Sequence, residues 1–188
     1  GADRAGLDVA IRWGFPHAGW CPKGRKAEDG TIGGQYQLVE TPSASYLQRT
    51  EWNARDSDAT VIFTIAPTLT GGSKRTAEFA AKHRKPCLHL PQHSSSYGSL
   101  ARLLQQFVEE NSVQVLNVAG TRGSKEPDVW RFAYDTLEAA FFWGKAIQAF
   151  SVGLARSKQK RSLSNYSVRR ASIYLAWWIT NVTAPQMM

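Results

Sequence analysis

Residues 59–90 decide the fold of this 188-residue chain and read ATVIFTIAPTLTGGSKRTAEFAAKHRKPCLHL. Residues 60–65 form an almost unbroken run of β-branched and aromatic side chains, which is typical of a parallel strand buried on both faces. A second apolar run at residues 87–90 predicts another strand. Between the two runs, Gly71 and Gly72 interrupt the pattern.

A helix is predicted directly after the glycine pair. Ser73 is a suitable N-cap, because its hydroxyl oxygen can accept a hydrogen bond from the first turn. Small or apolar residues then recur at helix spacing, at Thr76, Phe79, Ala80 and His83. The stretch therefore predicts a β-α-β unit.

In a right-handed β-α-β unit the glycine turn lies at the carboxyl end of the first strand, where the positive end of the helix also lies. Free N–H groups there attract phosphate or another oxyanion. Gly71, Gly72 and Ser73 are therefore candidate phosphate ligands. The alternative is that they form only a tight connection, and a lone glycine pair leaves both readings open.

The pattern occurs a second time. Residues 113–119 predict another buried strand, residues 120–127 form a glycine loop, and a helix is predicted from Pro127. Two such loops at the carboxyl ends of parallel strands would bracket one crevice, where Arg122 and Lys125 add positive charge. The repetition favours an anion or nucleotide site.

Four further candidate ligands lie outside these loops. Lys23 and Arg25 could clamp a ligand, although a solvated turn with local ion pairs would have the same composition. Asn53 and Asp56 lie three residues apart on one helical face and could reach hydroxyl groups of a ligand, although the end of a surface helix would look similar.

Few residues point to catalysis or to a metal. Glu78 is the one carboxylate considered as a general base, and its alternative role is to interact with the helix dipole. No nucleophile elbow of the Gly-x-Ser-x-Gly type is present. The four histidines form no ligand motif, since Pro91 between His89 and His93 argues against a shared helical face. The sequence predicts no metal site.

The remaining segments are predicted to be scaffold. Helices are expected over residues 1–14, with Gly14 as the C-cap, from Thr41 and Pro42 onward, and over residues 96–111. Short strands are expected at residues 15–20 and 36–39, with a loop over 21–30.

Composition describes a globular protein with a basic tail. The chain is 43% hydrophobic and 20% charged, and its two cysteines show no zinc or disulfide spacing. The longest apolar stretch, residues 171–180, is too short to span a bilayer, so we expect a cytoplasmic protein without a transmembrane segment. Residues 144–188 hold 7 of the 23 Lys and Arg and none of the 15 Asp and Glu. Nucleic acid is therefore expected as a partner only through this tail.

Several blocks resemble the bacterial putative molybdenum carrier family. They are GADRAGLDVAI at residues 1–11, GWCPKGRKAEDG at 19–30, RTEWNARDSDAT at 49–60, LTGGS at 69–73, KPCL at 85–88 and VLNVAGTRGSK at 115–125. The blocks occur in order at the right separations, so the resemblance is specific and covers residues 1–142.

The resemblance implies a Rossmann-like α/β domain, a three-layer parallel sheet flanked by helices, related to the lysine-decarboxylase-like (Lonely Guy) proteins. It also implies ligand-binding residues in three loops: Gly1, Asp3 and Arg4 in the first, Gly71, Gly72, Ser73 and Thr76 in the second, and Gly120, Arg122, Ser124 and Lys125 in the third.

The chain departs from the family at both ends. Family members begin with a strand ending in Gly-Gly-Gln-Thr-Gly, of which Gly1 is the last glycine, so the usual first strand is expected to be lacking. The resemblance places that strand in the centre of the sheet, where its loss would leave unpaired edges, and we expect a homo-oligomer. Residues 143–188 are expected to form a basic C-terminal extension, within which residues 172–180 could dock as a substitute strand.

Three functions are compatible with these patterns. The first is a non-catalytic binding or carrier domain for a phosphate-bearing small molecule, either a nucleotide derivative or the molybdenum cofactor. The alternative is a nucleoside monophosphate phosphoribohydrolase-like enzyme that uses Glu78 to cleave a nucleotide N-glycosidic bond. The third is an interaction protein that binds nucleic acid or acidic membrane through its basic tail.

Overall fold

The computed structural model describes residues 1–94, 96–143 and 174–175. Its central sheet contains four parallel strands in the order β6 (Cys87–Pro91), β5 (Ala59–Thr64), β7 (Val115–Gly120) and β8 (Tyr174–Leu175). All six residues of β5 are buried, as its β-branched sequence predicts for a strand covered on both faces. The sheet is thus parallel, in agreement with the β-α-β prediction.

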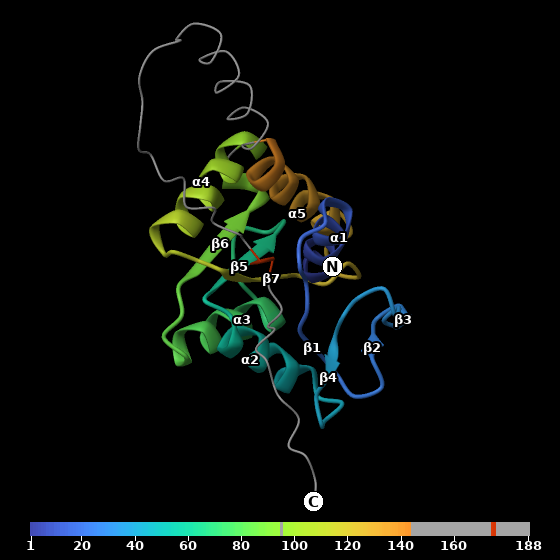
Figure 1. Cartoon of the computed structure of the whole chain (residues 1–188). Helices are drawn as coiled ribbons and strands as arrows, with labels where there is room; N and C mark the ends of the chain where they lie inside the picture. Colours follow the sequence, from blue (N-terminus) through green and yellow to red (C-terminus); the bar gives the residue numbers. More distant parts are fainter. Residues whose placement is uncertain (95, 144–173, 176–188) are drawn as a thin grey trace, which may run out of the picture.

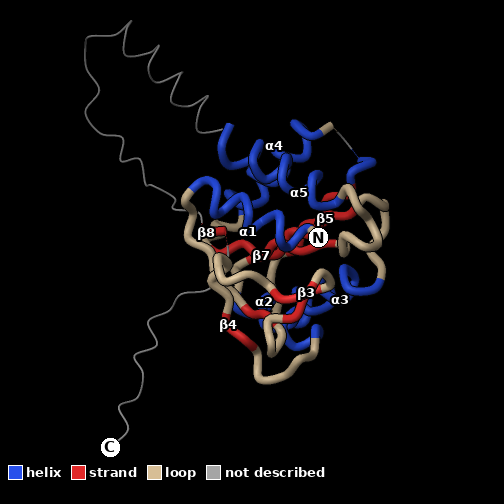
Figure 2. Tube along the Cα trace, turned by 90° about the vertical axis from the view of Figure 1, so that its right-hand side faces the viewer, coloured by secondary structure: helices blue, strands red, loops and turns tan. Residues whose placement is uncertain are grey.

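Helices cover both faces of this sheet (Figure 1). One layer contains α1 (Ala2–Trp13), α4 (Tyr97–Glu110) and α5 (Val129–Glu138), and the other contains α2 (Tyr46–Asp56) and α3 (Gly71–Lys82). Figure 2 shows the same three layers after a quarter turn. The expected α/β, Rossmann-like fold is therefore confirmed.

The core lies between β5, β7 and the layer of α1, α4 and α5. Phe63 of β5 and Phe132 of α5 pack edge to face, with ring centroids 5.6 Å apart. Leu100, Leu104 and Val108 of α4 are buried at helix spacing, whereas Leu103 on the same helix is 44% exposed. This packing fixes the carboxyl ends of the strands, where the glycine loops begin.

Two helices begin differently from the prediction. The N-cap of α3 is Thr70, and Ser73 is the third helical residue of a capping box with it, so the prediction that Ser73 is the N-cap is wrong. Helix α2 begins at Tyr46 rather than at Thr41. The Thr41 hydroxyl instead contacts the carbonyl oxygens of Cys21 and Ser43 in the segment before the helix.

A small β unit lies beside the three layers (Figure 2). Strand β1 (Trp20–Cys21) pairs in parallel with β4 (Val39–Glu40), and β2 (Lys26–Ala27) pairs antiparallel with β3 (Gly30–Thr31). The strands predicted at residues 15–20 and 36–39 are thus shorter and shifted. The β2–β3 hairpin replaces part of the loop predicted over 21–30, since four paired residues are too few to show an alternating pattern.

Little of the C-terminal extension can be compared with the prediction. Residues 144–173 and 176–188 lie outside the described part of the chain. Tyr174 and Leu175 pair with Val115 and Leu116 at the edge of the sheet beyond β7, inside the segment expected to dock as a strand. β5 pairs with both β6 and β7, whereas on the other side of β7 only Val115 and Leu116 have a strand partner among the described residues. No helix within the described ranges has the length and apolar character needed to cross a bilayer.

Candidate functional site

A cavity of about 280 Å³ lies where the carboxyl end of β7, the first turns of α3 and the inner face of α2 meet. Both predicted glycine loops reach it. The sequence-predicted residues that line it are Asp3, Asn53, Gly72, Ser73, Thr76, Gly120, Arg122 and Lys125. The structure therefore brings residues that lie more than 100 positions apart in the chain to the wall of one cavity.

Lys125 joins the two loops. A Cβ built on Gly71, which has a φ of +49°, would lie 3.8 Å from the Lys125 Nζ. Lys125 forms no ion pair with any residue that the structure describes. Its ammonium group therefore lies beside the amino end of α3 without a carboxylate to neutralise it.

Gly120 lets three elements approach closely. A Cβ at this position would lie 2.2 Å from the Phe63 carbonyl oxygen and 2.7 Å from the Ala2 Cβ, and neither neighbour can move away easily. A Cβ on Gly1 would likewise lie 2.8 Å from the Thr121 carbonyl oxygen. The start of α1 thus lies directly against the loop after β7.

The first turn of α3 offers backbone donors more than side-chain hydroxyls. The Ser73 hydroxyl donates to the Thr70 carbonyl at 2.7 Å, and the Thr76 hydroxyl donates to the Gly72 carbonyl at 3.0 Å. The N–H groups of Gly71 and Gly72 have no acceptor within the helix, because the first turn lacks preceding carbonyls. These N–H groups and the helix dipole favour an anion in the cavity.

Asp3 and Arg49 form a pair that lines this cavity and a second, larger one. The Arg49 Nη1 lies 3.3 Å from the Asp3 Oδ2. Burial raises the pKa of Asp3, but Arg49 and the other positive groups nearby outweigh it and hold that pKa below its ordinary value. Arg49 was not predicted from the sequence, although it lies four residues before Asn53 and so shares its helical face.

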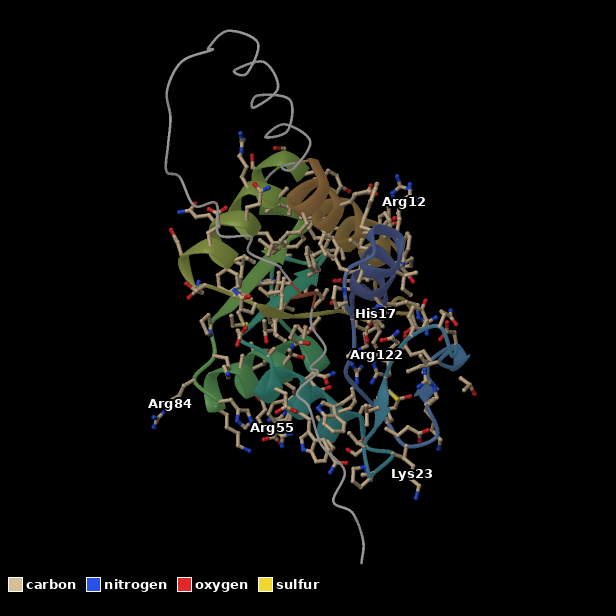
Figure 3. All side chains as sticks on the ribbon, viewed as in Figure 1. Arg12, His17, Lys23, Arg55, Arg84 and Arg122 are labelled. Atoms are coloured by element: carbon tan, nitrogen blue, oxygen red, sulfur yellow. The ribbon has the colours of Figure 1, made fainter. Side chains whose placement is uncertain are left out.

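The larger cavity has a volume of about 400 Å³ and lies between α1, the β2–β3 hairpin and the loop after β7. Gly1, Arg4 and Ser124 line it, and Asp3 and Arg122 line both cavities. Arg122 lies between α1 and the small β unit (Figure 3), with its guanidinium 5.1 Å from the centre of the Tyr46 ring. The positive charge of Arg122 therefore acts on both cavities.

Apolar and aromatic side chains form much of the remaining wall of the larger cavity, which Glu28 and Asp29 also line. The apolar and aromatic ones include Leu7, Trp20, Ile32, Tyr36 and Leu38. Tyr36 is fixed, since its hydroxyl donates to the Asp8 carboxylate at 2.7 Å. Partial burial, together with that hydrogen bond, raises the pKa of Tyr36 to about 12.

Lys23 and Arg25 do not line either cavity. Lys23 extends away from the molecule (Figure 3). The Arg25 guanidinium donates to the carbonyl oxygens of Ile32, Gly33, Tyr36 and Leu38 at 2.9 to 3.0 Å. Through these hydrogen bonds Arg25 has a structural role in the loop over residues 32–38.

Asn53 and Asp56 both contact Trp20. The Asn53 side chain accepts a hydrogen bond from the Trp20 backbone N–H at 3.2 Å, and the Asp56 carboxylate accepts one from the Trp20 indole at 2.8 Å. Asn53 still lines the smaller cavity, whereas Asp56 lines neither. The two side chains therefore fasten β1 to α2.

Two glutamates have placements that differ from what the sequence suggests. Glu78 is exposed, pairs with Arg75 at 2.8 Å and lines neither cavity. Glu126, which the sequence did not indicate, accepts hydrogen bonds from the N–H groups of Ile65 at 2.8 Å and Ala66 at 3.0 Å. It ties the loop after β7 to the segment that leads into α3.

The structure offers no cluster for a metal among its described residues. No three His, Cys, Asp or Glu side chains in these ranges lie close enough to hold an ion together. The two cavities instead offer cations, backbone N–H groups and aromatic rings, and the carboxylates of Glu28 and Asp29 also line the larger one.

Comparison with known proteins agrees with this architecture. The model of the circularly permutated YpsA SLOG family matches residues 1–141. The crystal structure of a putative molybdenum carrier protein from Syntrophus aciditrophicus SB is 42% identical, with a TM-score of 0.72, and the match covers 74% of this chain and 87% of that one. Among curated proteins, none matches. The chain therefore belongs to the circularly permutated YpsA SLOG family, and its resemblance to the putative molybdenum carriers is confirmed.

Proposed function

We propose that this chain is a non-catalytic binding or carrier domain for a phosphate-bearing small molecule. The observation that carries the proposal is the position of Lys125 beside the amino end of α3, at the cavity that Gly72 and Gly120 also line. A helix amino end and an unneutralised ammonium group together form a site for a phosphate group.

The charges around the smaller cavity support an anionic ligand. Arg49, Arg122 and Lys125 line it, and Asp3 supplies the only carboxylate among its described lining residues. Asp3 is itself paired with Arg49. Arg122 lies 3.4 Å from the Glu28 carboxylate, whereas Lys125 has no ion-pair partner among the described residues, so the positive charge available to a phosphate is that of Lys125.

Two ligand classes fit these residues, a nucleotide derivative and the molybdenum cofactor, since both carry phosphate. The similar protein from Syntrophus aciditrophicus has the name of a putative molybdenum carrier. In this chain the described residues hold no cluster for a metal ion, so they would bind either ligand through its phosphate and its ring. The cytoplasmic location and the homo-oligomeric state stay predictions.

Isothermal titration calorimetry with AMP and adenosine tests the proposal. We expect AMP to bind at least about a hundredfold more tightly than adenosine, because each charged hydrogen bond to phosphate contributes about 1.5 to 3 kcal/mol. Native mass spectrometry of gently purified protein would identify a retained ligand. Equal affinity for AMP and adenosine, with no phosphate compound retained, would refute the proposal.

A further inference from the structure

The two acidic residues at the turn of the β2–β3 hairpin, Glu28 and Asp29, bind cations that line the larger cavity. We call this pair the acidic tip. Both carboxylate oxygens of Asp29 contact the Arg4 guanidinium, with the Arg4 Nη2 3.0 Å from Oδ1. The Glu28 Oε1 accepts a hydrogen bond from the Ser124 hydroxyl at 2.9 Å and lies 3.4 Å from the Arg122 Nη1.

The partners of the acidic tip are the residues that suit an anionic ligand. Arg4 comes from the first turn of α1, and Arg122 and Ser124 come from the loop after β7. All three line the larger cavity, and Arg122 also lines the smaller one, where Lys125 lies. A carboxylate in this position satisfies the same donors that a phosphate oxygen would.

The contacts of the tip are of a kind that a ligand can replace. The side chains of Asp29 and Glu28 are 63% and 36% exposed, and exposed ion pairs contribute little to stability. The hairpin has only two paired residues on each strand, which gives it little stability of its own.

The two arginines also have contacts that do not involve the tip. Arg4 lies over the Tyr36 ring at 5.9 Å from its centre, and Tyr36 is fixed by Asp8, which also accepts a hydrogen bond from the Trp130 indole at 2.9 Å. Arg122 lies over the Tyr46 ring. Removal of the tip would therefore leave a formed cationic surface.

We propose that Arg4, Arg122 and Ser124 form a second anion position, which the acidic tip fills in the free protein and which a ligand with two linked anionic groups, such as a diphosphate, takes over by displacing the tip. Arg122 joins this position to the one at Lys125. A single phosphate needs only the position at Lys125, so the tip competes mainly with the diphosphate. This inference rests on the proposed function, because it assumes an anion at Lys125.

Calorimetry with inorganic pyrophosphate and inorganic phosphate tests the competition. The double variant E28Q/D29N should bind pyrophosphate about tenfold more tightly than the natural chain, since it removes two like charges from the site. Its affinity for phosphate should change much less. The matched control is E110Q/D135N, which removes the same charge from exposed Glu110 on α4 and half-buried Asp135 on α5, outside both cavities, and should change either affinity less than about twofold.

Hydrogen exchange of residues 26–31 supplies a second readout that needs no variant. Pyrophosphate should make these amides exchange faster in the natural chain, because the tip is released. If the natural chain binds pyrophosphate but E28Q/D29N gains no more than the control, or exchange of the hairpin slows, the tip does not compete and this inference is wrong. If no form of the protein binds either anion, the proposed function fails and this inference with it.

Discussion

The ammonium nitrogen of Lys125 lies against Gly71, the first residue of α3, so that a Cβ added to the glycine would be 3.8 Å away. The two residues come from glycine loops that follow different strands of the sheet. Their proximity shows that the loops after β5 and β7 face one another. The account of this protein as an anion-binding domain depends on this relationship.

The glycine pair at the start of α3 gives the first prediction. Gly71 has a φ of +49°, where a Cβ is strained, whereas Gly72 has no such φ and open space around it. G71A should therefore lower the free energy of unfolding by about 1 to 2 kcal/mol. G72A should raise it by up to about 1 kcal/mol, because alanine loses less entropy in a helix.

Urea denaturation of both variants measures these changes. The two substitutions add the same methyl group at neighbouring positions, so each is the control for the other. Equal effects on the free energy of unfolding would show that the left-handed conformation of Gly71 is not needed.

The next prediction concerns the contribution of Arg25 to the stability of the loop over residues 32–38. Its guanidinium holds four carbonyl oxygens between Ile32 and Leu38, which lysine cannot do with a single ammonium group. R25K should lower the free energy of unfolding by about 2 kcal/mol and accelerate hydrogen exchange across residues 32–38. K23Q should change both quantities little, because Lys23 extends into solvent (Figure 3). Similar results for the two variants would contradict this role of Arg25.

Glu126 should make stability depend on pH in the acid range. Burial raises its pKa, but hydrogen bonds from the N–H groups of Ile65 and Ala66 lower it more, so the net pKa in the folded protein lies below the ordinary value of 4.5. The unfolded chain therefore binds the proton more readily, and the stabilisation is complete above 4.5 and is lost as pH falls through the folded pKa.

Thermal unfolding of E126Q and the natural chain between pH 7 and pH 3 checks this dependence. E126Q should be less stable at pH 7, and the difference between the two proteins should shrink as the pH falls. The control E109Q replaces an exposed acid at the end of α4. A difference that stays constant over this range would contradict the assignment.

The strands of the sheet and the helices that cover it were predictable from the sequence, because their buried positions hold apolar or β-branched residues in a regular pattern. β5 follows from its run of β-branched and aromatic residues, and the buried face of α4 follows from apolar residues at the helical period. The first residue of a helix was harder to predict from the sequence. Thr70 and Ser73 can each cap α3, and only the backbone conformation shows which of them does. The β2–β3 hairpin contacts Arg4 and the loop after β7 through the acidic tip, and long-range contacts of this kind have no local sequence pattern.

The candidate site was partly predictable for the same reason. Glycine loops after buried strands indicated Gly72, Gly120 and Lys125, which the structure brings to one cavity. Asp56 and Glu78 were chosen from their positions in α2 and α3, and position along a helix cannot show that Asp56 contacts Trp20 and that Glu78 pairs with Arg75 at the surface. Arg49 enters the site only through the packing of α2 beside α3.

The most direct test of the account is the affinity of the K125Q variant for AMP, measured by calorimetry beside K82Q. Lys82 pairs with Glu51 outside both cavities, so K82Q removes the same charge elsewhere. We predict that K125Q weakens AMP binding by about tenfold or more while K82Q leaves it unchanged. Binding of AMP to K125Q with the affinity of the natural chain would contradict the claim that the two glycine loops hold a phosphate between them.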